Sequence, residues 1–263
     1  MKTIISKLRT TFSLALTIAS IGLLGLLLSV SHFRSQVASA QRIDYPQVKA
    51  KAEQEYAAGS YARAYEIYAK VSKTGLPEGE RRWIDFRLAD TAWRAQAGSQ
   101  TSDTTKSEQA IKQLDELIRV NDKEDDRDVI WAEAHESLGD LYWTRRGAMN
   151  WGLAWPHYQA ALDWWAGQPE IDRARSRYLK IVFKAAEPPR ADEYYFYTYY
   201  GNYIPLDILE NALKISAQEN DRAHLHFLIA MTMRAVGGDW ETRERVPDEF
   251  EAALKGGQKN RLV

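Results

Sequence analysis

The sequence predicts an all-α fold in which antiparallel helix pairs repeat along the chain. Small residues alternate with large apolar and aromatic residues at spacings of three and four, which places them on one face of a helix. The clearest pair combines residues 138–143 with residues 154–161, where Ala154, Tyr158 and Ala161 share a face. Small residues let crossing helices approach closely, and rings fill the space beside them. The same arrangement recurs before and after this pair.

The first 40 residues have the pattern of an export signal. Three basic residues precede an uncharged, leucine-rich run at residues 10–32, and residues 38–40 (Ala-Ser-Ala) offer the small side chains that a signal peptidase reads. We expect cleavage after Ala40. An uncleaved anchor is the alternative, because the run approaches the roughly 20 residues that span a bilayer. In both cases residues 41–263 are expected outside the cytoplasm, in the periplasm or at the cell surface.

The first helix pair is expected at about residues 48–71. Ala52 is its small residue, and Gly59 ends its first helix, because glycine accepts the left-handed conformation at a helix C-terminus. The second helix carries Ala64 and Tyr68, four residues apart. This pair therefore repeats the pattern of small and aromatic residues.

A second pair and a weaker later pair follow the same pattern. The large and small residues of the second pair are Trp83, Phe86, Ala89 and Trp93 on one helix, then Ala110, Leu114 and Leu117 on its partner. A polar loop at residues 98–105 separates them. The later pair has Ala223, Phe227, Ala230 and Met233, then Phe250 and Ala253.

The equivalent small residues fix the spacing of the units. Ala52, Ala89, Gly139 and Ala230 are separated by 37, 50 and 91 residues. The last interval is long enough for two units, of which the inner one has lost the pattern.

These residues resemble the tetratricopeptide repeat, which has a period of 34 residues. The resemblance covers about residues 46–255 and implies an α-solenoid with irregular insertions; an irregular helical bundle is the alternative. In that family the first helix of each pair lines the concave surface. The resemblance therefore implies partner-binding residues at Asp90, Trp93 and Arg94 and at Glu136, Asp140 and Trp143, although a solvated face has the same sequence pattern.

An aromatic insertion is expected at residues 190–205. It holds seven aromatic residues between positions 194 and 203, with prolines on both sides. Tyr197 and Tyr200 are its candidate binding residues, because tyrosine offers a wide amphipathic contact area. The alternative is that the insertion folds back and covers one edge of the helical repeat.

A second resemblance rests on residues 82–94, 103–106 and 131–165. They look like the helical region that precedes the macroglobulin domains of bacterial alpha-2-macroglobulin-like proteins. That family traps proteases with β-sandwich domains and often a cysteine thioester, and this chain has no cysteine. The resemblance therefore implies an accessory helical module, or a truncated N-terminal part of such a protein.

Composition and motifs argue against an enzymatic activity of this chain. Its five histidines form no metal-binding motif, the acidic run at residues 122–128 lacks the glycine of a calcium loop, and no nucleophile elbow or phosphate loop occurs. We expect no enzyme activity, no cofactor and no metal. The net charge is −1 and falls to about −5 without the first 40 residues, and no basic stripe indicates nucleic acid.

The sequence therefore predicts an exported, non-enzymatic helical-repeat scaffold that binds a protein or peptide partner at the cell envelope. The membrane would be a partner only through residues 10–32, if these stay attached. The alternative function is a glycan or cell-wall binding module that uses the aromatic residues 194–203.

Overall fold

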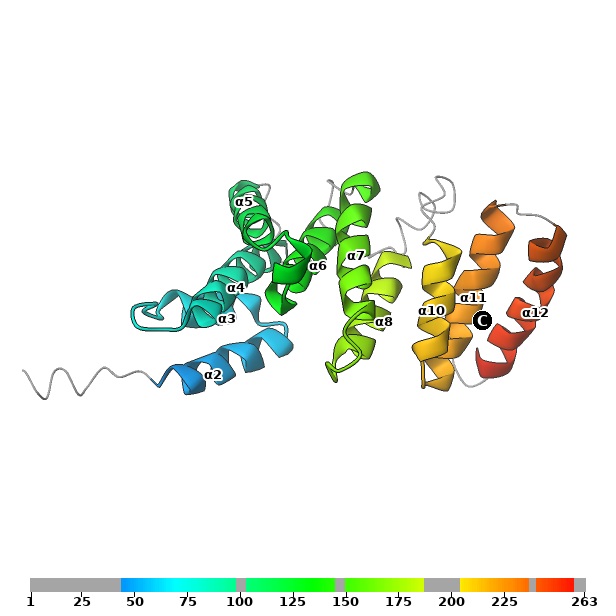
Figure 1. Ribbon diagram of the computed structural model, residues 1–263, viewed down its shortest axis with the longest axis horizontal. Coiled ribbons are helices and arrows are strands. Elements are labelled where there is room, and N and C mark those ends of the chain that lie inside the picture. The colour runs from blue at the N-terminus through cyan, green and yellow to red at the C-terminus, as the bar shows by residue number, and fades with distance from the viewer. Residues whose placement is uncertain (1–43, 98–102, 145–149, 187–203, 237–239, 258–263) are drawn as a thin grey trace, which may run out of the picture. The chain divides into compact units, whose positions relative to one another are not determined.

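The computed structural model describes residues 44–97, 103–144, 150–186, 204–236 and 240–257, and all of its secondary structure is helical (Figure 1). No strand occurs in these residues, so the all-α prediction is confirmed for this part of the chain. No helix within the described ranges has the length and apolar character needed to cross a membrane. The expected export segment, residues 1–40, lies outside the described residues.

The described residues form the following helices, given in chain order. They are α2 (Tyr45–Ala57), α3 (Tyr61–Ala69), α4 (Glu78–Ala97), α5 (Thr105–Val120), the short 3-10 helix η1 (Glu124–Asp126), α6 (Val129–Thr144), α7 (Trp151–Ala166), α8 (Ala174–Ala186), α10 (Leu206–Ile215), α11 (Glu219–Val236) and α12 (Trp240–Gly257).

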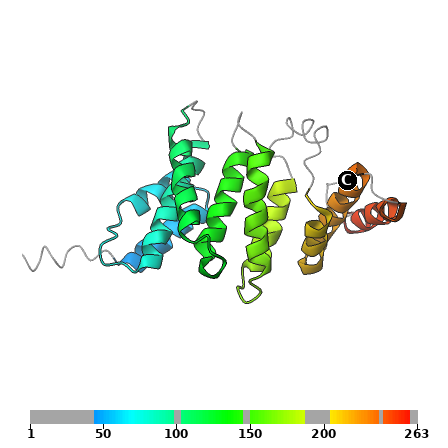
Figure 2. The same cartoon turned by 45° about the horizontal axis from the view of Figure 1, so that its top comes forward.

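Within the compact unit that begins at Lys51, each helix from α3 to α8 packs against the next one, as do α10, α11 and α12. Further contacts join α4 to α6, α6 to α8 and α8 to α10. Figures 1 and 2 show α6 and α8 on either side of α7. The alternate helices α4, α6 and α8 are therefore neighbours.

The turn between α2 and α3 forms as the sequence predicts. Gly59 has a φ of +76°, in the left-handed region. The N–H of Ser60 donates to the carbonyl of Glu55 at 2.9 Å, and the N–H of Gly59 donates to that of Tyr56 at 3.0 Å. This pair of bonds is the Schellman motif, which satisfies the last carbonyls of a helix.

The predicted small residues are all inside the protein. Ala52, Ala89 and Ala230 are fully buried, and Gly139 is buried against the ring of Tyr158. A Cβ at Gly139 would lie 2.6 Å from Cδ1 of Tyr158, closer than two carbons approach. Only glycine lets α6 come this near to α7.

The 91-residue interval between Gly139 and Ala230 contains α7, α8 and α10. Tyr178, Ile181, Val182 and Ala185 on α8 are buried in the larger of two apolar clusters, which also takes in side chains of α7, α10 and α11. The smaller cluster joins α4, α5 and α6.

Candidate functional site

Charged side chains lie along one side of α4, α6 and α8 at spacings of three and four residues. This set, the charged stripe, consists of Arg87, Asp90 and Arg94 on α4, Glu133, Glu136 and Asp140 on α6, and Arg177, Lys180 and Lys184 on α8. Such spacing keeps each row on one face of its helix. Because α6 contacts both α4 and α8, its acidic row has cations on both sides.

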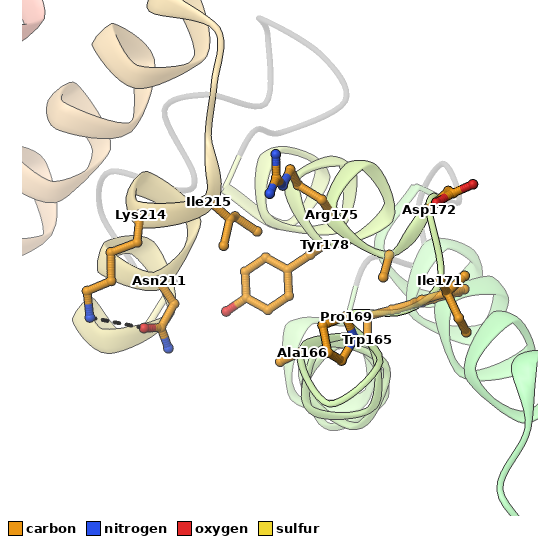
Figure 3. A pocket seen from close by; sticks show the side chains of 11 residues that line it. Trp165, Ala166, Pro169, Ile171, Asp172, Arg175, Tyr178, Asn211, Lys214 and Ile215 are labelled. Carbon is orange, nitrogen blue, oxygen red and sulfur yellow. Dashed lines mark hydrogen bonds between the residues drawn. The ribbon is translucent and has the colours of Figure 1, made fainter.

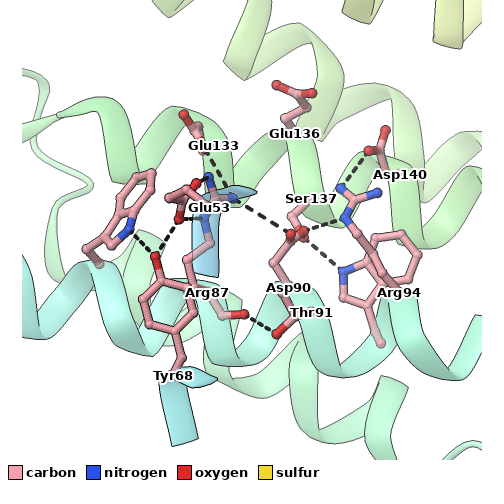
Figure 4. A network of polar contacts seen from close by, with 12 residues as sticks. Glu53, Tyr68, Arg87, Asp90, Thr91, Arg94, Glu133, Glu136, Ser137 and Asp140 are labelled. Atoms are coloured by element: carbon pink, nitrogen blue, oxygen red, sulfur yellow. Dashed lines mark hydrogen bonds and ion pairs between the residues drawn. The ribbon is translucent and has the colours of Figure 1, made fainter. Parts of the chain in front are cut away.

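Arg94 links the rows of α4 and α6, as Figure 4 shows. Its Nε donates to Asp90 at 2.8 Å, and its Nη2 donates to Asp140 at 2.8 Å. Asp90 also accepts the hydroxyl of Ser137 at 2.6 Å. Burial alone would raise the pKa of Asp90, but Arg94 and Arg87 hold this pKa below its usual value.

Lys184 links the rows of α6 and α8. Its ammonium donates to Glu136 and to Asp140, each at 2.7 Å. Burial would raise the pKa of Asp140, yet Lys184 and Arg94 keep it well below its usual range. The pKa of Lys184 is raised despite its burial, because both carboxylates attract its proton. Both groups are therefore charged at neutral pH.

Arg87 links α4 to α2. Its guanidinium donates to Glu53 of α2 at 2.8 and 2.7 Å. The same guanidinium lies 4.0 Å from the ring centroid of Tyr56 and 4.4 Å from that of Trp83. Two aromatic faces and a paired carboxylate thus hold this buried cation.

Glu133 is buried and lies among three arginines. Its carboxylate is 3.7 Å from Arg87, 3.2 Å from Arg173 and 3.4 Å from Arg177. Glu136 lies between two cations: its carboxylate is 2.8 Å from Arg177 and accepts from the ammonium of Lys184 at 2.7 Å. Each carboxylate of the stripe therefore has at least one cation close to it.

The structure brings four of the six predicted residues on α4 and α6 into one network: Asp90, Arg94, Glu136 and Asp140. The other two, Trp93 and Trp143, are 2% exposed beneath it. The indole N–H of Trp93 donates to Ser137 at 2.9 Å, and that of Trp143 donates to the carbonyl of Lys184 at 3.0 Å.

Partner binding by these six residues stays a prediction, as does binding by Tyr197 and Tyr200, which lie outside the described residues. Four further members of the network had gone unnoticed in the sequence: Arg87, Glu133, Arg177 and Lys184. Their signal is the repetition of charge at spacings of three and four, with opposite sign on neighbouring helices.

The geometry of the stripe suits binding better than proton transfer. General acid-base catalysis needs a group whose pKa lies near the working pH. The pKa values of Asp90 and Asp140 are lowered and that of Lys184 is raised, so all three move away from neutrality. No group of three metal-ligating side chains occurs in the part of the chain that the structure describes.

Two cavities lie outside the stripe. The first, about 530 Å³, lies between α7, α8 and α10 (Figure 3). Tyr178 projects from α8 toward Asn211 of α10, while Trp165 and Ala166 form the α7 side. Burial and the charges of Asp207 and Asp163 raise the pKa of Tyr178 to about 12, so its hydroxyl stays protonated.

The second cavity, about 750 Å³, is open to solvent and is lined by the end of α5, the turn η1, the start of α6 and the end of α7. Its lining includes Trp131, His135 and Trp164, together with four acidic side chains. Nδ1 of His135 lies 3.0 Å from Nδ1 of His157, so one imidazole donates to the other.

Comparison with known proteins gives no assignment for this fold or this site: no family model, no curated protein and no solved structure matches the chain.

Proposed function

We propose that the chain is an exported, non-enzymatic helical scaffold that binds a protein or peptide segment along the charged stripe. The helix pairs would stack as a tetratricopeptide-like α-solenoid. The contacts of α4 with α6 and of α6 with α8 support this arrangement, because first helices of successive pairs adjoin one another in a solenoid.

One observation carries the proposal: the three rows of charge lie side by side on alternate helices, and the α8 row reaches the surface. Lys180 is exposed, and the side chain of Arg173, just before α8, is 47% exposed. Partners with acidic groups could pair with these cations.

Charge reversal at one position of the stripe tests the proposal. Lys180→Glu changes an exposed member of the stripe, and Arg175→Glu makes the same change elsewhere on α8, about 200° from Arg177 and so off the stripe. Purified variants would capture binding proteins from an envelope fraction. We expect Lys180→Glu to lose at least tenfold of the capture seen with the unmodified chain and Arg175→Glu to retain it.

Equal capture by both variants, with equal melting temperatures, contradicts binding at the stripe. Binding to purified cell-wall polysaccharide that is lost in the double variant Tyr197→Ala, Tyr200→Ala would favour the glycan module instead. The proposed location predicts a mature chain that begins at Gln41, and mass spectrometry of the exported protein reads this directly.

The alpha-2-macroglobulin-like relationship is also a proposal. It rests on residues 82–94, 103–106 and 131–165, and the described helices supply no sandwich domain. A neighbouring reading frame that encodes macroglobulin-like sandwiches would support it.

A further inference from the structure

The cavity between α5, α6 and α7 has the chemistry of a site for a cation beside aromatic rings. Four carboxylates line it, from Asp122, Glu124, Asp125 and Asp163, against one guanidinium, from Arg127. Burial and the charge of His157 lower the pKa of His135 to about 3, so its imidazole adds no positive charge at neutral pH. The cavity is therefore strongly negative, and at about 750 Å³ it can admit a large side chain with its backbone.

A cation of the chain itself already lies on one wall. The guanidinium carbon of Arg127 is 4.6 Å from the ring centroid of Trp131, and its Nη2 is 3.8 Å from the carboxylate of Asp122. Arg127 reaches this position from an exposed turn. The arrangement demonstrates that the indole face, with the acids around it, accommodates a guanidinium.

Two ring nitrogens in the same wall have no partner. Trp131 is 3% exposed, and its indole N–H donates to none of the described residues. Nε2 of His135, one helical turn further along α6, also has no hydrogen-bond partner there. A buried indole N–H is normally satisfied, so that of Trp131 calls for an acceptor oxygen from water or from a ligand. A free cation cannot supply that oxygen, whereas a peptide can.

We propose that this cavity binds an arginine or lysine residue of a peptide segment. The cationic head would lie among the carboxylates and against the rings of Trp131 and Trp164, and a peptide carbonyl would accept the indole N–H of Trp131. This inference rests on the proposed peptide-binding function for its class of partner. It concerns another surface, because Trp131 and Glu133 point about 200° apart around α6.

Short peptides test the proposal without any natural partner. The probes are acetyl-Gly-Arg-Gly-amide and its citrulline analogue, which keeps the shape of arginine but is uncharged. Calorimetry with the mature chain should show at least tenfold tighter binding of the arginine peptide. Asp163→Asn with Glu124→Gln should weaken that binding at least tenfold, while Glu66→Gln, an exposed acid on α3, should leave it unchanged.

Arg127→Ala gives the sharpest result, because it removes the residue that competes for the ring of Trp131. We expect binding of the arginine peptide to tighten at least threefold, a gain that misfolding cannot produce. Equal binding of arginine and citrulline peptides, or weaker binding by Arg127→Ala, would overturn the proposal. So would preferential binding of a neutral oligosaccharide such as chitobiose, or of calcium chloride alone. Loss of the stripe-dependent capture would leave these outcomes unaffected.

Discussion

Gly139 illustrates how one residue sets the distance between two helices. The ring of Tyr158 occupies the space where a side chain would stand, and its hydroxyl donates to Asp140 at 2.8 Å. Tyr158 is fully buried, so its ring has no free direction in which to move.

Gly139→Ala should therefore destabilise the protein. The new Cβ would lie 2.6 Å from the ring of Tyr158. Forcing extra volume into a packed core costs about 1–3 kcal/mol. Urea unfolding measures the loss.

The control is Gly79→Ala in the first turn of α4, where a Cβ meets nothing within 4 Å. This change should raise the free energy of unfolding by about 0.4–1 kcal/mol, because it restricts the unfolded chain. Similar losses from both substitutions would contradict the close approach of α6 and α7.

At the scale of elements, the charged stripe adds ion pairs to the apolar contacts that hold α4, α6 and α8 together. Asp140 is its central residue, because it receives a cation from each neighbouring helix and a hydroxyl from α7. A buried carboxylate of this kind is costly to transfer from water, and its partners repay that cost only as a complete set.

Asp140→Asn should lower the free energy of unfolding by about 3–5 kcal/mol at pH 7, because it leaves the buried cations Arg94 and Lys184 short of one charge. Chemical denaturation at pH 7 provides the measurement. Asp163→Asn is the matched control: this carboxyl is exposed, and burial and Asp207 raise its pKa, so its charge is not a source of stability. An Asp140→Asn protein as stable as the control would mean that the stripe contributes no stability.

The elements also indicate what a sequence can and cannot reveal. The buried faces of α4, α5, α6 and α7 were predictable, because packing small residues against rings requires a fixed spacing within each helix. Helix α8 repeats that spacing with Ala174, Tyr178 and Ile181, all of them buried, although the interval between repeats had suggested only a degraded unit in its place.

Pairing between helices could not be predicted. Arg94 and Asp140 are 46 residues apart, and nothing local in the sequence specifies that their helices adjoin. The resemblance to a repeat family placed four residues on a concave surface: Asp90, Arg94, Glu136 and Asp140. It could not show that these side chains form ion pairs within the stripe. The ion pairs of Glu133 and Lys184 can be recognised only once the packing of the neighbouring helices is known.

At the scale of the whole molecule, stability should fall in two steps as the pH is lowered. The pKa of an unfolded histidine is about 6.5. In the folded chain, burial and His157 lower the pKa of His135 to about 3. Protons therefore bind the unfolded chain first, so this stability is complete above the unfolded pKa and is lost as the pH drops toward the folded one.

Between pH 7 and 5 the carboxylates remain ionised in both states, and the loss belongs to the histidines. We expect a decrease of about 2 kcal/mol from His135 by pH 5. Asp90 and Asp140, whose folded pKa values are lowered, add a second decrease below about pH 4.

Urea unfolding across this pH range measures both steps. His135→Asn keeps a hydrogen-bonding group near Nδ1 but cannot be protonated, so it should flatten the first step and leave the second. A wild-type curve that is level from pH 7 to pH 5 contradicts this account of the histidine pair.

Tyr158 belongs to both of the features that organise this chain: its ring wedges α6 against α7, and its oxygen is tied to the acidic row of α6. A bound partner that attracts the carboxylate of Asp140 would remove the hydrogen-bond acceptor of the Tyr158 hydroxyl. The packing of the Tyr158 ring between α6 and α7 would then loosen. Occupancy of the polar surface would then be felt in the apolar interior, as faster amide exchange along the seam around Gly139 and Ala154. Binding at the stripe, as proposed, would thus be coupled to the stability of the core through the hydroxyl of Tyr158.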